Sequence, residues 1–236
     1  MDYGQLPLGV NAVQSPENVP QPEPEETIAL RQLLAAEKID LTDHQIELLD
    51  RYRRLLWSWN ERMNLTRHTT LEKFVGRDVI DSFQLAQLLK PKERVLDVGS
   101  GGGVPGVVLA VLRPDVTISL SESTQKKARA LESIVSDLGL KTPVYGTRAE
   151  EVLEVNTFDT LVARALAALP KVLAAFAPYW GAFDQLLLIK GPNWVDERNA
   201  ARHQGLLKGL ELRKVKTYEC PVTGAESVIL KIWRPP

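Results

Sequence analysis

The sequence predicts an α/β fold with a Rossmann-like, mostly parallel sheet, a C-terminal antiparallel hairpin and an N-terminal helical extension. From Arg94 onward, short strand-like segments alternate with helical segments, which is the pattern of a parallel sheet with helices on both faces. The first of these strand-like segments runs into the glycine-rich stretch "DVGSGGGVPG" (97–106). Near the end of the chain, two strand-like segments joined by a turn with Thr223 and Gly224 predict the hairpin.

The composition is that of an ordinary globular protein. Of 236 residues, 44% are hydrophobic and 25% are charged. No apolar run is long enough for a membrane span, so no membrane partner is expected. The first residues lack the basic and apolar regions of a secretory signal, and the single cysteine, Cys220, fits a reducing compartment, so a cytoplasmic location is expected. Three scattered histidines give no metal-ligand spacing, and no metal is expected.

The chain divides into three regions. Residues 1–26 hold five prolines, five acidic residues and no Lys or Arg, so a disordered acidic tail is expected there. Residues 27–90 are expected to form a helical cap, and residues 91–236 the domain with the sheet. Without the five acids of the tail, the chain has 25 acidic and 29 basic residues. This slightly positive net charge is compatible with a nucleic-acid partner but does not require one.

Three helices are expected before the sheet. The segment "TIALRQLLAAEKI" (27–39) has leucines at helical spacing. The second helix begins at Thr42, which forms a plausible capping box with Gln45. The third covers about 71–89 and is expected to break near Gly76.

The remaining elements alternate along the chain. Strands are expected at 94–99, 117–122, 143–147, 158–164 and 185–191, with the hairpin strands at 210–221 and 226–233. Helices are expected near 105–112, 124–138, 149–153, 166–178 and 195–208.

The glycine-rich stretch predicts a ligand site. Glycines permit unusual backbone angles and close approach, and the following helix offers free N–H groups. Gly101-x-Gly103-x-x-Gly106 matches the dinucleotide fingerprint, and Glu122 lies about 20 residues on, where an acid would bind a ribose. An NAD(P)-dependent oxidoreductase is therefore one interpretation.

S-adenosyl-L-methionine is the other ligand considered, and three features favour it. Asp97 stands two residues before Gly99, which gives a pattern typical of methyltransferases. The chain ends in a predicted antiparallel hairpin, as methyltransferase sheets usually do. After the third strand, Ala149 and Glu150 supply a short side chain and an acid that could border an adenine ring.

The residues from about Trp57 to Gly191 resemble the rRNA small subunit methyltransferase G family, also called glucose-inhibited division protein B. The Val-Pro-Gly ending of the glycine loop is more specific to this family than the glycines are. Similar motifs occur in order and at matching spacing: "WNERMNLT", "GRDVIDS", "LDVGSGGGVPGVVLA", "SESTQKKARAL", "TRAEE", "FDTLVARALAAL" and "LLLIKG".

This resemblance implies a class I S-adenosylmethionine-dependent methyltransferase that methylates N7 of a guanine in 16S rRNA of the small ribosomal subunit. A monomer is expected. The resemblance carries over Glu122 as ribose ligand and five further cofactor contacts, to which the glycine argument adds Gly101 and Gly103. Those five are Gly99, Val104, Ala149, Glu150 and Arg164.

The sequence departs from the family at three positions. Asp78 stands where the family usually has histidine, Glu122 replaces aspartate, and Leu166 replaces an aromatic residue. Glutamate keeps the carboxylate, whereas the loss of the histidine leaves its role open. A protein that binds without catalysing, and a methyltransferase for small molecules, remain alternatives.

The expected chemistry explains why no catalytic residue is assigned. Guanine N7 has a lone pair and no proton to lose, so attack on a sulfonium methyl needs placement but no general base. RNA phosphates would be bound by basic side chains near the strand ends. The RNA-binding candidates are Arg77, Lys126, Lys127, Arg148 and Lys190. Lys126 and Lys127 have the alternative interpretation of a solvated helix face.

Overall fold

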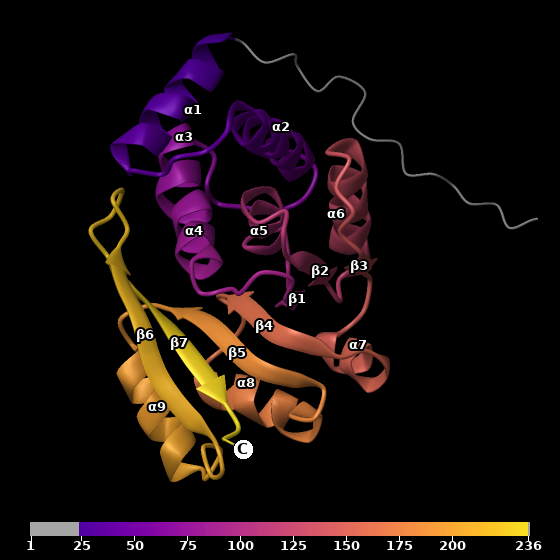
Figure 1. The fold of residues 1–236 in the computed structure, drawn as a ribbon, viewed down its shortest axis with the longest axis vertical. Coiled ribbons are helices and arrows are strands. Elements are labelled where there is room, and N and C mark those ends of the chain that lie inside the picture. The colour runs from indigo at the N-terminus through magenta and orange to yellow at the C-terminus, as the bar shows by residue number, and fades with distance from the viewer. Residues whose placement is uncertain (1–23, 236) are drawn as a thin grey trace, which may run out of the picture.

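The computed structural model describes residues 24–235, which form one seven-stranded sheet between two layers of helices (Figure 1). The strand order is β3-β2-β1-β4-β5-β7-β6, with β7 antiparallel to both of its neighbours, and the expected fold class is confirmed. The strands are β1 (Arg94–Val98), β2 (Thr117–Ser121), β3 (Val144–Tyr145), β4 (Phe158–Arg164), β5 (Phe183–Lys190), β6 (Glu211–Glu219) and β7 (Glu226–Trp233).

Each face of the sheet has its own hydrophobic core. Alternate residues of a strand point to opposite faces, so Val95 packs with the helices of the first half of the chain and Leu96 with those of the second half. The first layer holds α1 (Pro24–Ala36), α2 (Asp43–Asn60), α3 (Leu71–Lys73), the π-helix η1 (Phe74–Val79), α4 (Ile80–Ala86), α5 (Gly106–Leu112) and α6 (Gln125–Asp137). The second holds α7 (Ala149–Val155), α8 (Leu169–Phe176), the 3-10 helix η2 (Ala177–Tyr179) and α9 (Trp194–His203).

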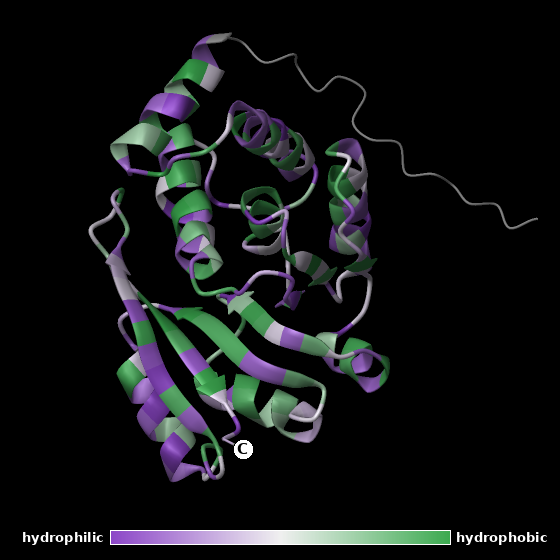
Figure 2. Cartoon of the chain, viewed as in Figure 1, coloured by the Kyte–Doolittle hydropathy of each residue, from purple (hydrophilic) through white to green (hydrophobic). Residues whose placement is uncertain are grey.

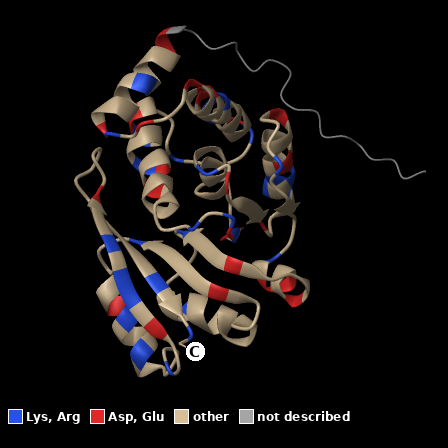
Figure 3. Cartoon of the chain, viewed as in Figure 1, with Lys and Arg blue, Asp and Glu red and all other residues tan. Residues whose placement is uncertain are grey.

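The edge strand β6 differs from the strands inside the sheet. Figure 2 shows hydrophobic colouring along much of β5 and hydrophilic colouring along most of β6. Figure 3 shows several positive charges on β6, which come from Arg213, Lys214 and Lys216. Charged side chains on an edge strand discourage pairing with another sheet, so the sheet ends at β6.

The capping box at the start of α2 is present. Thr42 Oγ1 accepts a hydrogen bond from the Gln45 N–H at 3.3 Å, and Gln45 Oε1 accepts one from the Thr42 N–H at 3.1 Å. Gln45 Nε2 also donates to the carbonyls of Val111 and Leu112 at the end of α5. The Gln45 side chain therefore also attaches α2 to α5.

The break expected near Gly76 is wrong, because the helix continues through Gly76 as η1. A side chain has no room at this glycine: a Cβ would lie 2.4 Å from Cγ2 of Val222 in the β6–β7 turn. Cys220 Sγ also donates to the Gly76 carbonyl at 3.3 Å. The widened π-helical turn carries Asp78, so this packing positions an acidic side chain at the functional site discussed below.

Other boundaries differ slightly from expectation. The helix expected at 166–178 begins at Leu169, after a loop in which Ala165 has a φ of 51°. Most of the expected tail lies outside the described residues, but its residues 24–26 begin α1. Between residues 24 and 235, no helix has the length and apolar character needed to cross a bilayer.

Candidate functional site

The glycine loop lies at the carboxyl ends of β1 and β2, where open α/β sheets bind ligands. Gly99, Gly101 and Gly103 have φ values of 69°, 56° and 105°, a region that side chains rarely adopt. A Cβ on Gly101 would have no protein atom closer than 3.9 Å, so this position faces open space. The loop therefore forms a backbone cradle with room above it.

The loop is held from both sides. Asp97 Oδ2 accepts a hydrogen bond from the Gly106 N–H at 3.0 Å, and a Cβ on Gly106 would lie only 2.2 Å from Leu120 Cδ2. From the helical extension, Tyr52 Oη donates to the Gly102 carbonyl at 2.9 Å. These contacts fix the cradle before any ligand arrives.

Glu122 also belongs to the cradle. Its carboxylate accepts the Gly101 N–H at 2.9 Å through Oε2 and the Thr124 N–H at 2.7 Å through Oε1. Each oxygen keeps a further lone pair, so the side chain remains suited to ribose hydroxyls. Its bond to the loop was not foreseen from the sequence, where only its distance along the chain singled it out.

Two buried carboxylate oxygens beside the loop have no hydrogen-bond partner among the described residues: Asp97 Oδ1 and Asp78 Oδ2. Burial raises the pKa of Asp97 to about 7. Burial, and then the charge of Asp78, also raise the pKa of Tyr52, which lies against the loop. A buried carboxylate oxygen without a hydrogen-bond partner is costly, and a bound ammonium group would remove that cost. The site therefore fits a ligand such as S-adenosylmethionine, which carries one.

Asp97→Asn is expected to stabilise the ligand-free protein at high pH and to weaken binding of S-adenosylmethionine. Because the pKa of Asp97 in the folded state lies above its ordinary value of 3.8, the folded protein binds this proton more tightly than the unfolded chain. Stability of the natural protein therefore falls as pH rises from about 4 to about 7. Asparagine removes this dependence, which should favour the variant by about 2–3 kcal/mol more at pH 8 than at pH 5.

Urea denaturation of both proteins at several pH values measures this difference. Asp40→Asn, at an exposed aspartate, is the matched control and should show no comparable growth with pH. A stability difference that stays constant between pH 5 and 8 would contradict the assignment of Asp97 as an uncompensated buried acid.

Arg164, at the end of β4, lies in a buried ionic network. Its Nη1 is 2.7 Å from Asp78 Oδ1 and 3.2 Å from Asp81 Oδ2. Asp81 Oδ1 accepts a hydrogen bond from Tyr218 Oη at 2.7 Å, and both aspartates are almost fully buried. The network links the helical extension, the sheet and the hairpin at one point beside the glycine loop.

The structure adds an imidazole that sequence reasoning missed. His68 Nδ1 lies 2.8 Å from Asp78 Oδ1, so a histidine contacts the residue that replaces the family's histidine. Arg77 and Asp81 form an i,i+4 pair at 3.8 Å, but Asp81 lies closer to Arg164. No local sequence spacing pointed to His68, because it comes from the loop before α3.

Lys190 ends β5 beside a cavity of about 270 Å³. Its Nζ is 2.7 Å from Glu197 Oε2 on α9 and donates to the Ala167 carbonyl. Six of the residues lining the cavity are Arg77, Arg164, Ala167, Lys190, Glu197 and Ser227. Lys190 is thus a largely buried, paired cation rather than an exposed one, and Glu197 was not singled out from the sequence.

The other predicted site residues lie around the cradle. Lys126 is exposed and Lys127 half-buried on the first turn of α6, and Arg148 is exposed before α7. The five RNA candidates therefore form two groups, because Arg77 and Lys190 line the cavity instead. At the start of α7 Ala149 is buried and Glu150 is half-buried, while Val104 is half-buried in the glycine loop.

Leu166 covers the glycine loop. Its Cδ1 lies 2.7 Å from the position that a Cβ on Gly99 would take, and the side chain is 37% exposed. Leu166 thus places an apolar side chain against the glycine loop, in place of the aromatic residue usual in the family.

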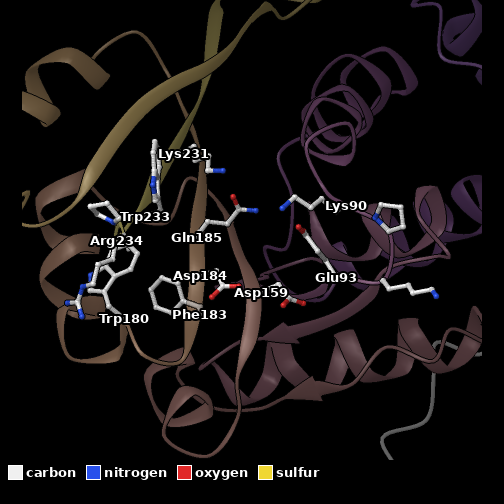
Figure 4. Close-up of a pocket in the computed structure, with 13 residues that line it drawn as sticks. Lys90, Glu93, Asp159, Trp180, Phe183, Asp184, Gln185, Lys231, Trp233 and Arg234 are labelled. Carbon is white, nitrogen blue, oxygen red and sulfur yellow. The ribbon is translucent and has the colours of Figure 1, made fainter.

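A larger hollow, of about 630 Å³, lies at the other end of the strands, away from the glycine loop. Figure 4 shows Lys90 and Glu93 on one side of it and Gln185 with Asp159 on the other. These residues surround the amino ends of β1, β4 and β5. Parallel sheets bind ligands at the carboxyl ends of their strands, so the glycine loop is the stronger candidate site.

Comparisons with known proteins identify one family. A family model described as GidB, rRNA small subunit methyltransferase G, matches residues 45–223. A relative from Rhodopirellula baltica named ribosomal RNA small subunit methyltransferase G is 55% identical over 170 residues, which cover 72% of this chain and 74% of that protein. A relative of the same name from Chromobacterium violaceum is 37% identical over 70% of this chain and 79% of its own.

A solved structure supports the fold. A mutant of MtNAS in complex with S-adenosylmethionine aligns with a TM-score of 0.54 at 16% identity, over 91% of this chain and 80% of that one. At this identity the likeness concerns the arrangement of helices and strands.

Proposed function

The chain belongs to the rRNA small subunit methyltransferase G family, and from this premise we propose that it methylates N7 of one guanine in 16S rRNA. It is an rRNA methyltransferase that depends on S-adenosylmethionine. The oxidoreductase interpretation of Gly101-x-Gly103-x-x-Gly106 is wrong, because the family and the named relatives are methyltransferases. The same relatives favour RNA over a small molecule as substrate.

The observation that carries the proposal is the cradle with an unpartnered carboxylate oxygen beside it. Gly101 leaves open space above the loop, and Asp97 presents a buried oxygen without a partner. Glu122 would bind the ribose hydroxyls, with Ala149 and Glu150 beside the adenine ring. S-adenosylmethionine, when bound, supplies a methyl group on a positively charged sulfur.

The remaining residues suit attack by a base without a proton to lose. No general base is required, so placement and charge decide the rate. Methylated guanine is cationic, and carboxylates near the reacting atoms stabilise developing positive charge. Asp78 and Asp81 supply two carboxylates beside the guanidinium of Arg164, and Arg77 lies farther away, 3.8 Å from Asp81.

RNA binding is assigned to two basic groups. Lys126, Lys127 and Arg148 would contact phosphates on the side of β2 and β3, while Arg77 would do so at the cavity. The helical cap, residues 27–90, would complete the cofactor pocket through Tyr52 and the RNA-facing surface through Arg77. We further propose that the protein acts as a monomer in the cytoplasm, where rRNA is available and the thiol of Cys220 stays reduced.

Transfer of an isotopically labelled methyl group from S-adenosylmethionine tests the proposal. The purified protein is incubated with naked 16S rRNA, with assembly intermediates and with small subunits that lack the modification. Label in at least one of these RNAs is expected. Absence of label from all three, with S-adenosylmethionine still bound in calorimetry, would refute ribosomal RNA as the substrate.

A further inference from the structure

The cavity beside Arg164 lies next to the cradle. It is formed at the carboxyl ends of β4 and β5 and at the start of β7, and α9 contributes Glu197. Leu166 contacts Gly99 from the loop that also contributes Ala165 and Ala167 to the cavity. A volume of about 270 Å³ is at the small end of ligand pockets and suits one planar base. Enzymes that modify a base commonly take it out of the stack into such a pocket.

The polar groups of the cavity are arranged as a donor beside an acceptor. Lys190 Nζ lies 2.7 Å from Glu197 Oε2, and the Leu169 N–H donates to the same oxygen at 2.6 Å. An ammonium has three N–H groups, of which two are used here, by Glu197 and the Ala167 carbonyl. Both bonds to Glu197 end on Oε2, so Oε1 remains as an acceptor. The pair can therefore offer one donor and one acceptor side by side.

The Lys190–Glu197 pair is also shielded from water, which strengthens its contacts. The side chain of Lys190 is 10% exposed and that of Glu197 is 26% exposed. Leu169 is the first residue of α8, so its N–H and the Lys190 ammonium together hold the carboxylate in one orientation. A fixed, partly dehydrated donor–acceptor pair discriminates between ligands more strongly than mobile surface charges.

Guanine carries the complementary pattern on its Watson–Crick edge. Its O6 accepts a hydrogen bond and the neighbouring N1–H donates one, whereas adenine has a donor at N6 and an acceptor at N1. We infer that Lys190 donates to O6 and Glu197 accepts from N1–H of the target guanine, so that the pair selects guanine over adenine. N7 lies on the other side of O6 from N1, and this contact leaves it free for methylation.

This inference rests on the proposed function, because it concerns the base that the protein modifies. In the inference Glu197 and Lys190 recognise and position the base, and neither takes or gives a proton. The ion pair would then serve two roles, since it also holds the start of α8 against α9.

The test compares Glu197→Gln with Asp196→Asn, which removes a neighbouring exposed carboxylate on the same helix. Single-turnover methyl transfer is measured at saturating S-adenosylmethionine on small subunits that lack the modification. Loss of one base contact is expected to slow Glu197→Gln by about 5- to 150-fold, with an unchanged dissociation constant for S-adenosylmethionine. Asp196→Asn should stay within about twofold of the natural protein. Equal rates for both variants would overturn the inference.

A binding measurement separates recognition from a merely structural role. Small subunits that carry adenine at the target position are prepared, and their affinity is compared with that of subunits carrying guanine. The natural protein should prefer guanine, and Glu197→Gln should lose most of this preference. An unchanged preference would show that Glu197 only supports the fold and would overturn the inference.

Failure of the inference and failure of the proposed function give different results. If the natural protein prefers guanine-bearing subunits but transfers no methyl group to N7, the proposed function fails and the recognition stands. If Glu197→Gln does not fold, Lys190→Met removes the donor to O6 instead, and the same loss of preference is expected. A preference retained in a folded Lys190→Met protein would contradict the assignment.

Discussion

Replacing Gly101 with valine is expected to weaken binding of S-adenosylmethionine by about 100-fold, which corresponds to about 3 kcal/mol. Gly101 has a φ of 56°, and the space that its Cβ would enter contains no protein atom within 3.9 Å. A branched side chain would therefore project into the space above the cradle. It would also strain the backbone of residue 101, whose N–H donates to Glu122. Isothermal titration calorimetry measures the effect.

Gly139→Val is the matched control for backbone strain. Gly139 has a φ of 67° at the end of α6, and a Cβ there would meet nothing within 4 Å. This variant should lose a similar amount of stability but bind S-adenosylmethionine with unchanged affinity. If both variants bind the cofactor equally well, Gly101 does not line the cofactor site.

Arg164→Met is expected to lower the free energy of unfolding by about 3–5 kcal/mol at pH 8, because it leaves Asp78 and Asp81 buried without their closest cation. Methyl transfer should be lost as well, because the network lies beside the glycine loop. Urea denaturation at pH 8 measures the effect on stability.

Two further variants test the cause of this loss. Arg164→Met combined with Asp78→Asn removes one of the unpaired charges and should recover part of the stability. Arg213→Met breaks an exposed pair with Glu211 and should have little effect. A loss in Arg164→Met as small as that in Arg213→Met would show that Arg164 does not stabilise the two buried aspartates.

Much of the fold could be predicted from the sequence because local patterns determine it. Alternation of strands and helices after Arg94 implied the parallel sheet, and Thr42 with Gln45 marked the start of α2. The π-helical turn at Gly76 could not be predicted in this way. At this turn Gly76 packs against Val222, a residue almost 150 positions further along the chain.

Only part of the candidate site could be predicted from local sequence patterns. The glycine loop and Glu122 follow from backbone chemistry at a strand end, and both lie at the expected edge of the sheet. Glu197 and His68 acquire their places through tertiary contacts with Lys190 and Asp78, which no sequence spacing encodes. The glycine loop could thus be located from the sequence, while the structure was needed to find the cavity beside Arg164.

Mapping the methylated atom is the most direct test of the central claim. After transfer from labelled S-adenosylmethionine, the small-subunit RNA is treated with borohydride and aniline, which cleave the chain at guanines methylated on N7. One labelled RNA site that is also cleaved is the predicted result. Label that enters the RNA without creating a cleavage site would contradict methylation of guanine N7.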